Sequence, residues 1–196
     1  MAAIGIDTGG TFTDFIWLDE AGQLRLHKEP STPADPSQAV LAGLAAGGAT
    51  TAGVIHGSTV ATNALLQRCG ARTALIATEG FADVLAIGRQ NRPDLYALVP
   101  QKPPPLVPAA WRLEARERIS AGGEVLVPLD EAALAAALTR LDAGDVESVA
   151  VCLLFSFLRP EHERRIGALL AERFGPALHV SLSSDILPEY REFERT

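Results

Sequence analysis

Lysine and long apolar runs are both scarce in this sequence, and their scarcity excludes two classes of partner. Lys28 and Lys102 are the only lysines, and the net charge is −7 with a pI of about 5.1. Nucleic acids and anionic membrane surfaces bind clustered Lys and Arg, so we expect neither as a partner. No apolar run is long enough to span a bilayer, and the first residues lack the charged region of a signal peptide. We therefore expect a cytoplasmic globular protein, and its bias toward arginine and alanine indicates a GC-rich bacterial genome.

Cysteine is rare as well. Cys69 and Cys152 lie far apart in apolar or helical contexts, which favours free buried thiols in a reducing compartment over a disulfide. With 196 residues, 47% of them hydrophobic, the chain can bury a core as one large domain or two small ones.

The common phosphate-binding P-loop is absent, because no Gly-Lys-Ser or Gly-Lys-Thr occurs. A different pattern stands at residues 4–14, where an apolar run ends at Asp7, turns through Gly9 and Gly10, and restarts as a strand at Phe12. A carboxylate at a strand end can hold hydrated Mg²⁺, and two glycines let successive backbone N–H groups face one anion. The pattern predicts a hairpin that holds the phosphates of a nucleotide, with Asp7 as the metal ligand. Hydroxyl donors to the phosphates would come from Thr8, Thr11 and Thr13. The alternative is a tight hairpin with no ligand.

Strand and helix patterns alternate along the chain, which predicts an α/β fold. We expect strands over 2–7, 12–18, 24–28, 53–56, 72–78, 148–155 and 179–182. We expect helices from a cap at Asp35 or Ser37 to Gly47–Gly48 and over 58–68, 131–141 and 160–174, with a helical turn over 81–87. The order of the first seven elements is that of the ribonuclease-H-like half shared by actin, hexokinase-type sugar kinases and Hsp70 chaperones. A mixed sheet with additional α/β elements is therefore expected.

Prolines interrupt this pattern over residues 88–128. They forbid a continuous helix and stiffen the chain, so a disordered linker is one interpretation. The other is an ordered insertion that wraps the domain, because Leu95, Tyr96, Leu98 and Trp111 supply apolar surface. We favour the insertion.

Several motifs together resemble the N-terminal region of the hydantoinase A / 5-oxoprolinase family. They cover nearly the whole chain in order and lie at residues 7–14, 56–65, 80–85, 87–93, 117–119, 153–157 and 187–196. The resemblance implies an actin-like ATPase subunit that uses ATP and Mg²⁺ to open hydantoin or 5-oxoproline rings. In that reaction ATP phosphorylates the ring amide oxygen, and water completes the cleavage. Some relatives use the same activation to carboxylate acetone or acetophenone.

Family members are several times longer, and an actin-like fold closes two similar halves on the nucleotide. We therefore expect residues 1–182 to form the N-terminal domain, with 88–128 as the Pro-rich insertion. Residues 183–196 should begin the connection to a second half and expose Ile186, Leu187 and Tyr190 as an interface. A hydantoinase B-type subunit is the other expected partner, and this chain alone should be inactive.

Three residues are candidates for catalysis: Asp7, His56 and Asn63. A histidine that ends a strand can bind metal or substrate, although it more often bonds nearby backbone. Asn63 lies within a predicted helix, where asparagine is unfavourable, and this indicates a functional role for its polar side chain.

Four further residues are candidates for substrate contact. Ser58 and Thr59 gain this role from the resemblance and otherwise read as helix caps. Arg89 and Arg92 lie close together in a predicted turn. The arginine guanidinium can bind a carboxylate or phosphate of the substrate, but ion pairs at the protein surface are an equal alternative.

Two rival functional classes stay open. A sugar kinase needs an aspartate as general base in its cleft, and residues 56–66 contain no acid, which weighs against it. A ketone carboxylase subunit or a non-catalytic actin-like nucleotide-binding protein would share the hairpin, so the residues alone do not separate them from a cyclic-amide hydrolase.

Overall fold

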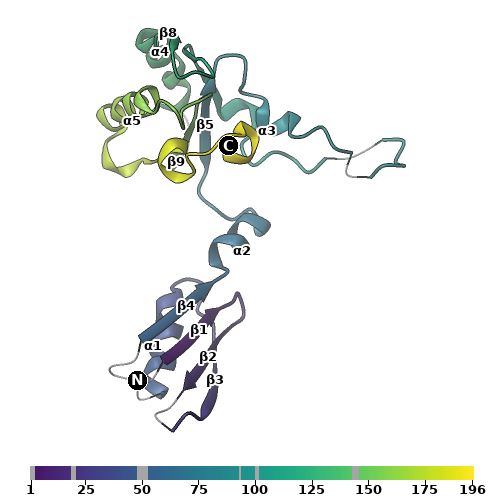
Figure 1. The fold of residues 1–196 in the computed structure, drawn as a ribbon, viewed down its shortest axis with the longest axis vertical. Helices are drawn as coiled ribbons and strands as arrows, with labels where there is room; N and C mark the ends of the chain where they lie inside the picture. The colour runs from purple at the N-terminus through teal and green to yellow at the C-terminus, as the bar shows by residue number, and fades with distance from the viewer. Residues whose placement is uncertain (1–2, 19–20, 48–52, 93, 100–101, 143–145) are drawn as a thin grey trace. The chain divides into compact units, whose positions relative to one another are not determined.

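Two units make up the chain, Met1–Gly70 and Ala71–Thr196, and each is described here by itself (Figure 1). The structure, a computed structural model, describes residues 3–18, 21–47, 53–92, 94–99, 102–142 and 146–196. The predictions that involve Ala2, Gly48 and Pro93 lie outside the described residues.

The first unit is a four-stranded mixed sheet with two helices. Its elements are β1 Ala3–Thr8, β2 Phe12–Leu18, β3 Leu24–Pro30, α1 Pro36–Ala46, β4 Gly53–Ser58 and α2 Val60–Gln67. The strand order is β3-β2-β1-β4, with β1, β2 and β3 antiparallel and β4 parallel to β1. All six agree with the predicted segments to within about two residues.

Helix α1 covers one face of this sheet because alternate residues of β1 and β2 are apolar. The buried side chains are Ile4, Ile6, Phe15 and Trp17, against which Val40 and Leu44 of α1 pack. Alternation places the side chain of Thr8 on this same face and that of Asp7 on the opposite one. The hairpin that ends β1 therefore offers different chemistry on its two sides.

The second unit centres on a parallel sheet of order β10-β9-β5-β6. Its elements are β5 Thr73–Thr78, α3 Val84–Ile87, the 3₁₀ turn Ala109–Trp111, β6 Arg112–Ala115, β7 Arg118–Ile119, β8 Val125–Val127, α4 Glu131–Asp142, β9 Ser148–Cys152, α5 Glu161–Phe174, the 3₁₀ turn Gly175–Ala177, β10 His179–Leu182, α6 Ser183–Ile186 and α7 Glu192–Arg195. Leucines of α4 join Ile166 and Leu170 of α5 in the main core, against Ile76 and Val151 of the sheet.

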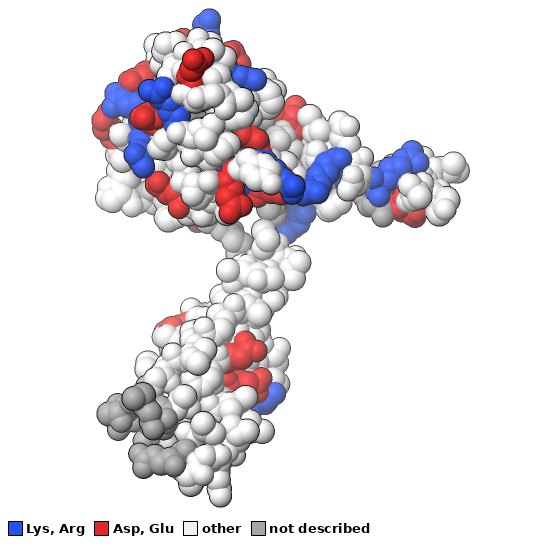
Figure 2. Space-filling view, in the orientation of Figure 1, with Lys and Arg blue, Asp and Glu red and all other residues white. Residues whose placement is uncertain are grey.

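Charged side chains are interspersed over the second unit on the face drawn in Figure 2. Arg165 of α5, for example, donates to both carboxylate oxygens of Glu131 at the start of α4, at 2.8 and 2.7 Å. This contact holds the pKa of the Glu131 carboxyl below its ordinary value. Within the described ranges, every helix is too short or too polar to span a bilayer.

The mixed α/β fold is confirmed, but one strand lies in a different sheet from the one its position in the sequence implies. The ribonuclease-H-like order puts the strand at 72–78 beside the first four, whereas β5 pairs with β6 and β9 in the second sheet. Residues Ala74–Thr78 of this strand are buried, as suits a central parallel strand. The ribonuclease-H-like classification therefore stays a prediction.

The first part of the Pro-rich segment differs from its prediction. Leu95, Tyr96 and Leu98 are exposed, Leu98 to 98%, so the expectation that they pack against the domain is wrong. Later in the same segment, Val107 is buried and β6 joins the sheet, so these residues pack into the second unit.

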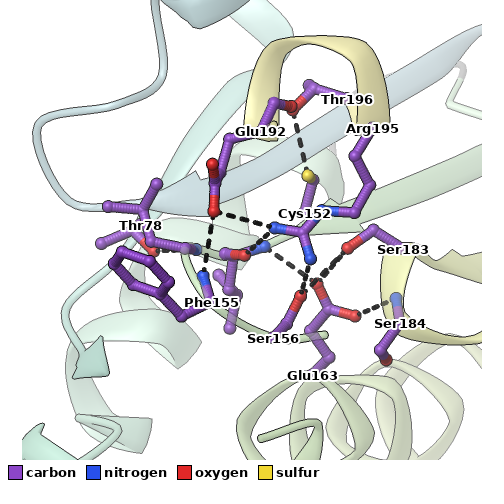
Figure 3. Close-up of polar contacts among 12 residues, drawn as sticks. Thr78, Cys152, Phe155, Ser156, Glu163, Ser183, Ser184, Glu192, Arg195 and Thr196 are labelled. Atoms are coloured by element: carbon purple, nitrogen blue, oxygen red, sulfur yellow. Dashed lines mark hydrogen bonds and ion pairs between the residues drawn. The ribbon is translucent and has the colours of Figure 1, made fainter. Parts of the chain in front are cut away.

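Residues 183–184 and 192–196 pack into the second unit (Figure 3), whereas Ile186, Leu187 and Tyr190 are exposed, as expected. The Arg195 side chain is buried and donates to Ser156 Oγ at 2.8 Å and to the Leu153 carbonyl at 2.7 Å. Thr196 Oγ1 lies 3.0 Å from Cys152 Sγ, and Glu192 accepts from the Phe155 amide at 3.3 Å. These contacts tie the segment to the end of β9, where we expected only the start of a connection. Whether a second half follows stays a prediction.

A buried carboxylate supports the same region. Glu163 of α5 is fully buried and accepts from the Leu153 amide, Ser183 Oγ and the Ser184 amide at 2.6–2.9 Å (Figure 3). Burial also raises the pKa of the Cys152 thiol, which agrees with the expected buried thiol. Cys69 is exposed, so that expectation is wrong for Cys69, which follows α2 at the surface.

Candidate functional site

The hairpin between β1 and β2 pairs Asp7 with Asp14 and Thr8 with Thr13. The Gly9 amide donates to the Phe12 carbonyl at 3.0 Å and closes the turn. In the part of the chain that the structure describes, the Gly10 and Thr11 amides donate to no protein acceptor. Two adjacent backbone donors are therefore free to bind an anion.

Gly9 and Gly10 suit this turn because neighbouring atoms lie close to their Cα atoms, and not because the backbone takes unusual φ angles. Neither Gly9 nor Gly10 has a φ in the left-handed region, so the anion nest predicted from the glycine pair does not rely on positive φ. A Cβ at Gly10 would stand 3.2 Å from Asn63 Nδ2, and one at Gly9 would stand 3.0 Å from the Phe12 carbonyl oxygen. Both positions leave little room for a side chain.

Two of the three threonines bond to protein side chains. Thr8 Oγ1 lies 3.0 Å from His56 Nε2, and Thr13 Oγ1 lies 3.1 Å from Ser31 Oγ, which in turn donates to the Gly9 carbonyl at 2.8 Å. Thr8 and Thr13 are buried, whereas Thr11 is exposed at the turn. The phosphate role stays a prediction for all three, and Thr11 is the one whose position suits it best.

A row of charged residues crosses the face of the sheet that carries Asp7. Asp14 of β2 is in register with Asp7 on one side and with Lys28 of β3 on the other, and Lys28 Nζ lies 3.0 Å from Asp14 Oδ1. Gly57 of β4 is the neighbour of Asp7 on the other side and leaves its carboxylate uncovered. We call Asp7, Asp14 and Lys28 the carboxylate row.

Carboxylates in register on neighbouring strands repel, so a cation near Asp7 and Asp14 is favourable. Among the described residues, no three His, Cys, Asp or Glu side chains group closely enough to hold a metal. Mg²⁺ commonly binds one or two carboxylates and completes its shell with water and phosphate oxygens, which fits this pair. Asp14 and Lys28 were missed from the sequence, where only the predicted strand pairing could have pointed to them.

On the opposite face a cavity of about 320 Å³ adjoins the turn. We call it the hairpin pocket. Its lining comes from the turn, from the loop between β3 and α1, and from α2 and the residues after it: Thr8, Gly9, Gly10, Ser31, Thr32, Pro33, Pro36, Val60, Asn63, Ala64, Gln67 and Cys69.

Helix α2 is held against the hairpin at its first residues. The Thr59 amide donates to the Thr8 carbonyl at 3.1 Å, and Asn63 Nδ2 lies 3.3 Å from Thr59 Oγ1. Ser58 Oγ accepts from the Val60 amide at 3.3 Å, but the N-cap residue of α2 is Thr59, and its side chain makes no capping hydrogen bond. The structure thus brings Asn63 to the hairpin pocket, while His56 supports Thr8 and Asp7 faces the other way.

Arg89 and Arg92 belong to the second unit and are described apart from the hairpin. Arg89 forms an ion pair with Glu194, and Arg92 Nη1 lies 3.4 Å from the Leu95 carbonyl oxygen. The ion pair at Arg89 matches the alternative interpretation of that residue, and a role in substrate binding stays a prediction for both.

Comparison with known proteins identifies the family. The hydantoinase/oxoprolinase N-terminal region matches residues 3–174. The alpha subunit of caprolactamase from Pseudomonas jessenii is 37% identical over 98% of this chain and 30% of its own length. The 5-oxoprolinase of Saccharomyces cerevisiae is 36% identical over 67% of this chain and 12% of its own length.

Solved structures agree with this match. A nucleotide-free acetone carboxylase aligns over 99% of this chain and 30% of its own chain, with 31% identity and a TM-score of 0.86. The chain therefore spans about 30% of the length of the caprolactamase and acetone carboxylase chains. On the family match and these identities, the chain belongs to the hydantoinase/oxoprolinase family and carries its N-terminal region.

Proposed function

We propose that this chain supplies the phosphate-binding hairpin of an ATP-dependent subunit that activates a cyclic amide for ring opening. The observation that carries the proposal is the turn at Gly9 and Gly10, with two free backbone donors at Gly10 and Thr11. It lies between the carboxylate row and the hairpin pocket. Caprolactamase and 5-oxoprolinase, which act on rings of this kind by name, are relatives and support the substrate class.

Each group has a task in this proposal. The amides of Gly10 and Thr11 bind phosphate oxygens, and Asp7 with Asp14 holds the metal ion that accompanies ATP. When bound, Mg²⁺ would neutralise phosphate charge and so favour transfer to the amide oxygen. Asn63 contacts the ring from α2, and His56 keeps the Thr8 hydroxyl oriented. Transfer of the terminal phosphoryl group from ATP to the amide oxygen releases ADP and makes the ring carbon electrophilic. Water then adds to that carbon, and the C–N bond breaks with the protonated amine as leaving group. A second water hydrolyses the resulting acyl phosphate to carboxylate and phosphate.

The remainder of the site would come from elsewhere in the protein. An actin-like fold, to which the strand order of the first unit is suited, closes a second half over the nucleotide. Caprolactamase, acetone carboxylase and acetophenone carboxylase relatives are subunits by name, which supports a partner subunit of hydantoinase B type here.

Ketone carboxylation is the second candidate, because acetone carboxylase shares this fold at a TM-score of 0.86. Both candidates activate the substrate with ATP. They differ in the next reactant, which is water in the hydrolase and bicarbonate in the carboxylase. Turnover that requires a ketone and bicarbonate would favour the carboxylase, whereas turnover of a cyclic amide in their absence would favour the hydrolase.

ATP hydrolysis by the intact protein with its partner subunit tests the hairpin assignment. We expect Asp7→Asn to abolish turnover that depends on a cyclic amide, while the circular dichroism spectrum is unchanged because Asp7 is exposed. Glu124→Gln removes an exposed carboxylate outside the hairpin and should retain full activity. Wild-type turnover by Asp7→Asn would refute the assignment.

A further inference from the structure

We propose that the hairpin pocket selects an uncharged ring, a lactam or hydantoin, against the anionic ring of 5-oxoproline. This inference rests on the proposed function and narrows its substrate class. It follows from the charge, the size and the hydrogen-bonding groups of the pocket.

Among the described residues that line the pocket, none has a charged side chain. The polar side chains of the lining are hydroxyls and carboxamides, and the remaining side chains are prolines, Val60, Ala64 and a thiol. The Gly10 amide also lies at the pocket, and in the proposed function it is taken up by a phosphate oxygen. A carboxylate that enters such a site loses water and gains no cation in return, which is costly.

Outside the lining, the basic side chains in the described part of the first unit are engaged. Lys28 pairs with Asp14 on the opposite face, His27 with Glu29, and His56 Nε2 is bonded to Thr8 Oγ1. Arg25 and Arg68 also have interactions of their own.

The size of the pocket suits one small ring. At about 320 Å³ it stands at the lower end of the range for ligand pockets, about 300–1,000 Å³. The cavity is large enough to hold one small ring amide, and in this proposal the ATP phosphates bind at the turn.

The polar groups suit an amide in particular. Val60, Asn63, Ala64 and Gln67 follow the i, i+3, i+4, i+7 spacing, so one flank of α2 lines the pocket. A ring amide presents a carbonyl acceptor and an N–H donor side by side, and a side-chain carboxamide offers the complementary pair. Asn63 donates one N–H to Thr59 Oγ1, and within the described ranges no protein group bonds to its other N–H or to its side-chain oxygen.

A binding experiment on the intact protein isolates this inference from catalysis. Cys69 is exposed and lines the pocket, so its alkylation rate reports occupancy, while buried Cys152 serves as the slow internal reference. We expect ε-caprolactam or hydantoin to slow the alkylation of Cys69 at least about tenfold, and 5-oxoproline at the same concentration to leave it unchanged. Equal or stronger protection by 5-oxoproline, or no protection by either neutral ring, would overturn the inference.

A charge substitution tests the same point in turnover. Gln67→Arg places a cation at the pocket, and we expect it to raise kcat/KM for 5-oxoproline at least about tenfold relative to the neutral lactam. Gln38→Arg adds the same charge to the exposed face of α1 outside the pocket and should leave the ratio unchanged. Equal effects of the two variants would overturn the inference. If the wild type opens 5-oxoproline in preference to neutral rings, the inference about the pocket is overturned and the proposed function stands. If it opens no ring at all, the proposed function is refuted as well.

Discussion

At Gly10 the absence of a side chain keeps the turn open next to α2. The nearest atom to a Cβ there would be Asn63 Nδ2 at 3.2 Å, and a larger side chain would also cover the free Gly10 and Thr11 amides. Because Gly10 has no left-handed φ, the effect of a substitution is steric and involves no backbone strain.

Gly10→Val should therefore lower ATP turnover of the intact protein by about tenfold or more. The valine side chain would block the approach of phosphate to the Gly10 and Thr11 amides, and about 1.4 kcal/mol of lost transition-state stabilisation corresponds to a factor of ten in rate. Gly53→Val is the matched control, because a Cβ at Gly53 meets nothing within 4 Å and valine suits a strand. Equal turnover by the two variants would show that the turn does not contact phosphate.

Helix α1 is positioned by a glycine rather than by its apolar stripe alone. A Cβ at Gly43 would stand 2.0 Å from Phe15 Cζ, so the helix approaches β2 closely only because that atom is missing. Gly167 in α5 offers a contrast, since its Cβ would make ordinary contacts of 3.5–3.9 Å with Leu182.

Gly43→Ala should destabilise the protein by about 1–3 kcal/mol through overpacking, although alanine normally favours a helix interior by about 1 kcal/mol. Gly167→Ala should be neutral or stabilising. Urea unfolding of both variants gives the comparison. A Gly43→Ala protein as stable as the wild type would mean that α1 moves away from Phe15 without cost.

The start of α1 depends on pH through Asp35. Its carboxylate accepts from the Ser37 amide at 3.1 Å and from Ser37 Oγ at 2.6 Å, and these bonds hold the pKa of Asp35 below its ordinary value of 3.8. A lowered folded-state pKa stabilises the protein above the unfolded pKa, and this contribution is lost as pH falls through the folded value.

Thermal unfolding at neutral pH should therefore show a lower Tm for Asp35→Ala than for the wild type, and the difference should shrink below about pH 4. Glu79→Ala is the control, because it removes an exposed carboxylate from the turn after β5, and it should match the wild type at both pH values. A Tm difference for Asp35→Ala that persists undiminished at about pH 2, where the carboxyl is protonated, would argue against the carboxylate as the cap.

At the scale of the whole molecule, the chain spans about 30% of the length of the caprolactamase and acetone carboxylase chains. We therefore expect it to bind nucleotide weakly. The hairpin offers phosphate contacts on one wall, through the Gly10 and Thr11 amides. Affinity for small ligands comes largely from burial of most of their surface. Calorimetry on this 196-residue chain should therefore detect weak ATP binding or none. A micromolar Kd would show that the chain holds a more complete nucleotide site than the hairpin supplies.

Much of the fold follows from local pattern. The strands around the turn, the capped start of α1 at Asp35 and the amphipathic α5 agree with their predicted ranges, because alternation, capping and helical spacing act over a few residues. The sequence motifs were likewise sufficient to identify the hydantoinase/oxoprolinase family. The Pro-rich segment was the main error, since apolar residues such as Leu98 are exposed despite their composition.

The candidate site required the folded chain, because strand register and long-range packing are not encoded in any short window. Asp14 and Lys28 join Asp7 only through pairing across three strands, and no spacing in the sequence reveals it. The hairpin pocket likewise draws on the turn, the loop before α1 and α2. Sequence pattern thus established the elements and the family, whereas contacts between residues far apart in the chain established which side chains meet and which charges remain paired.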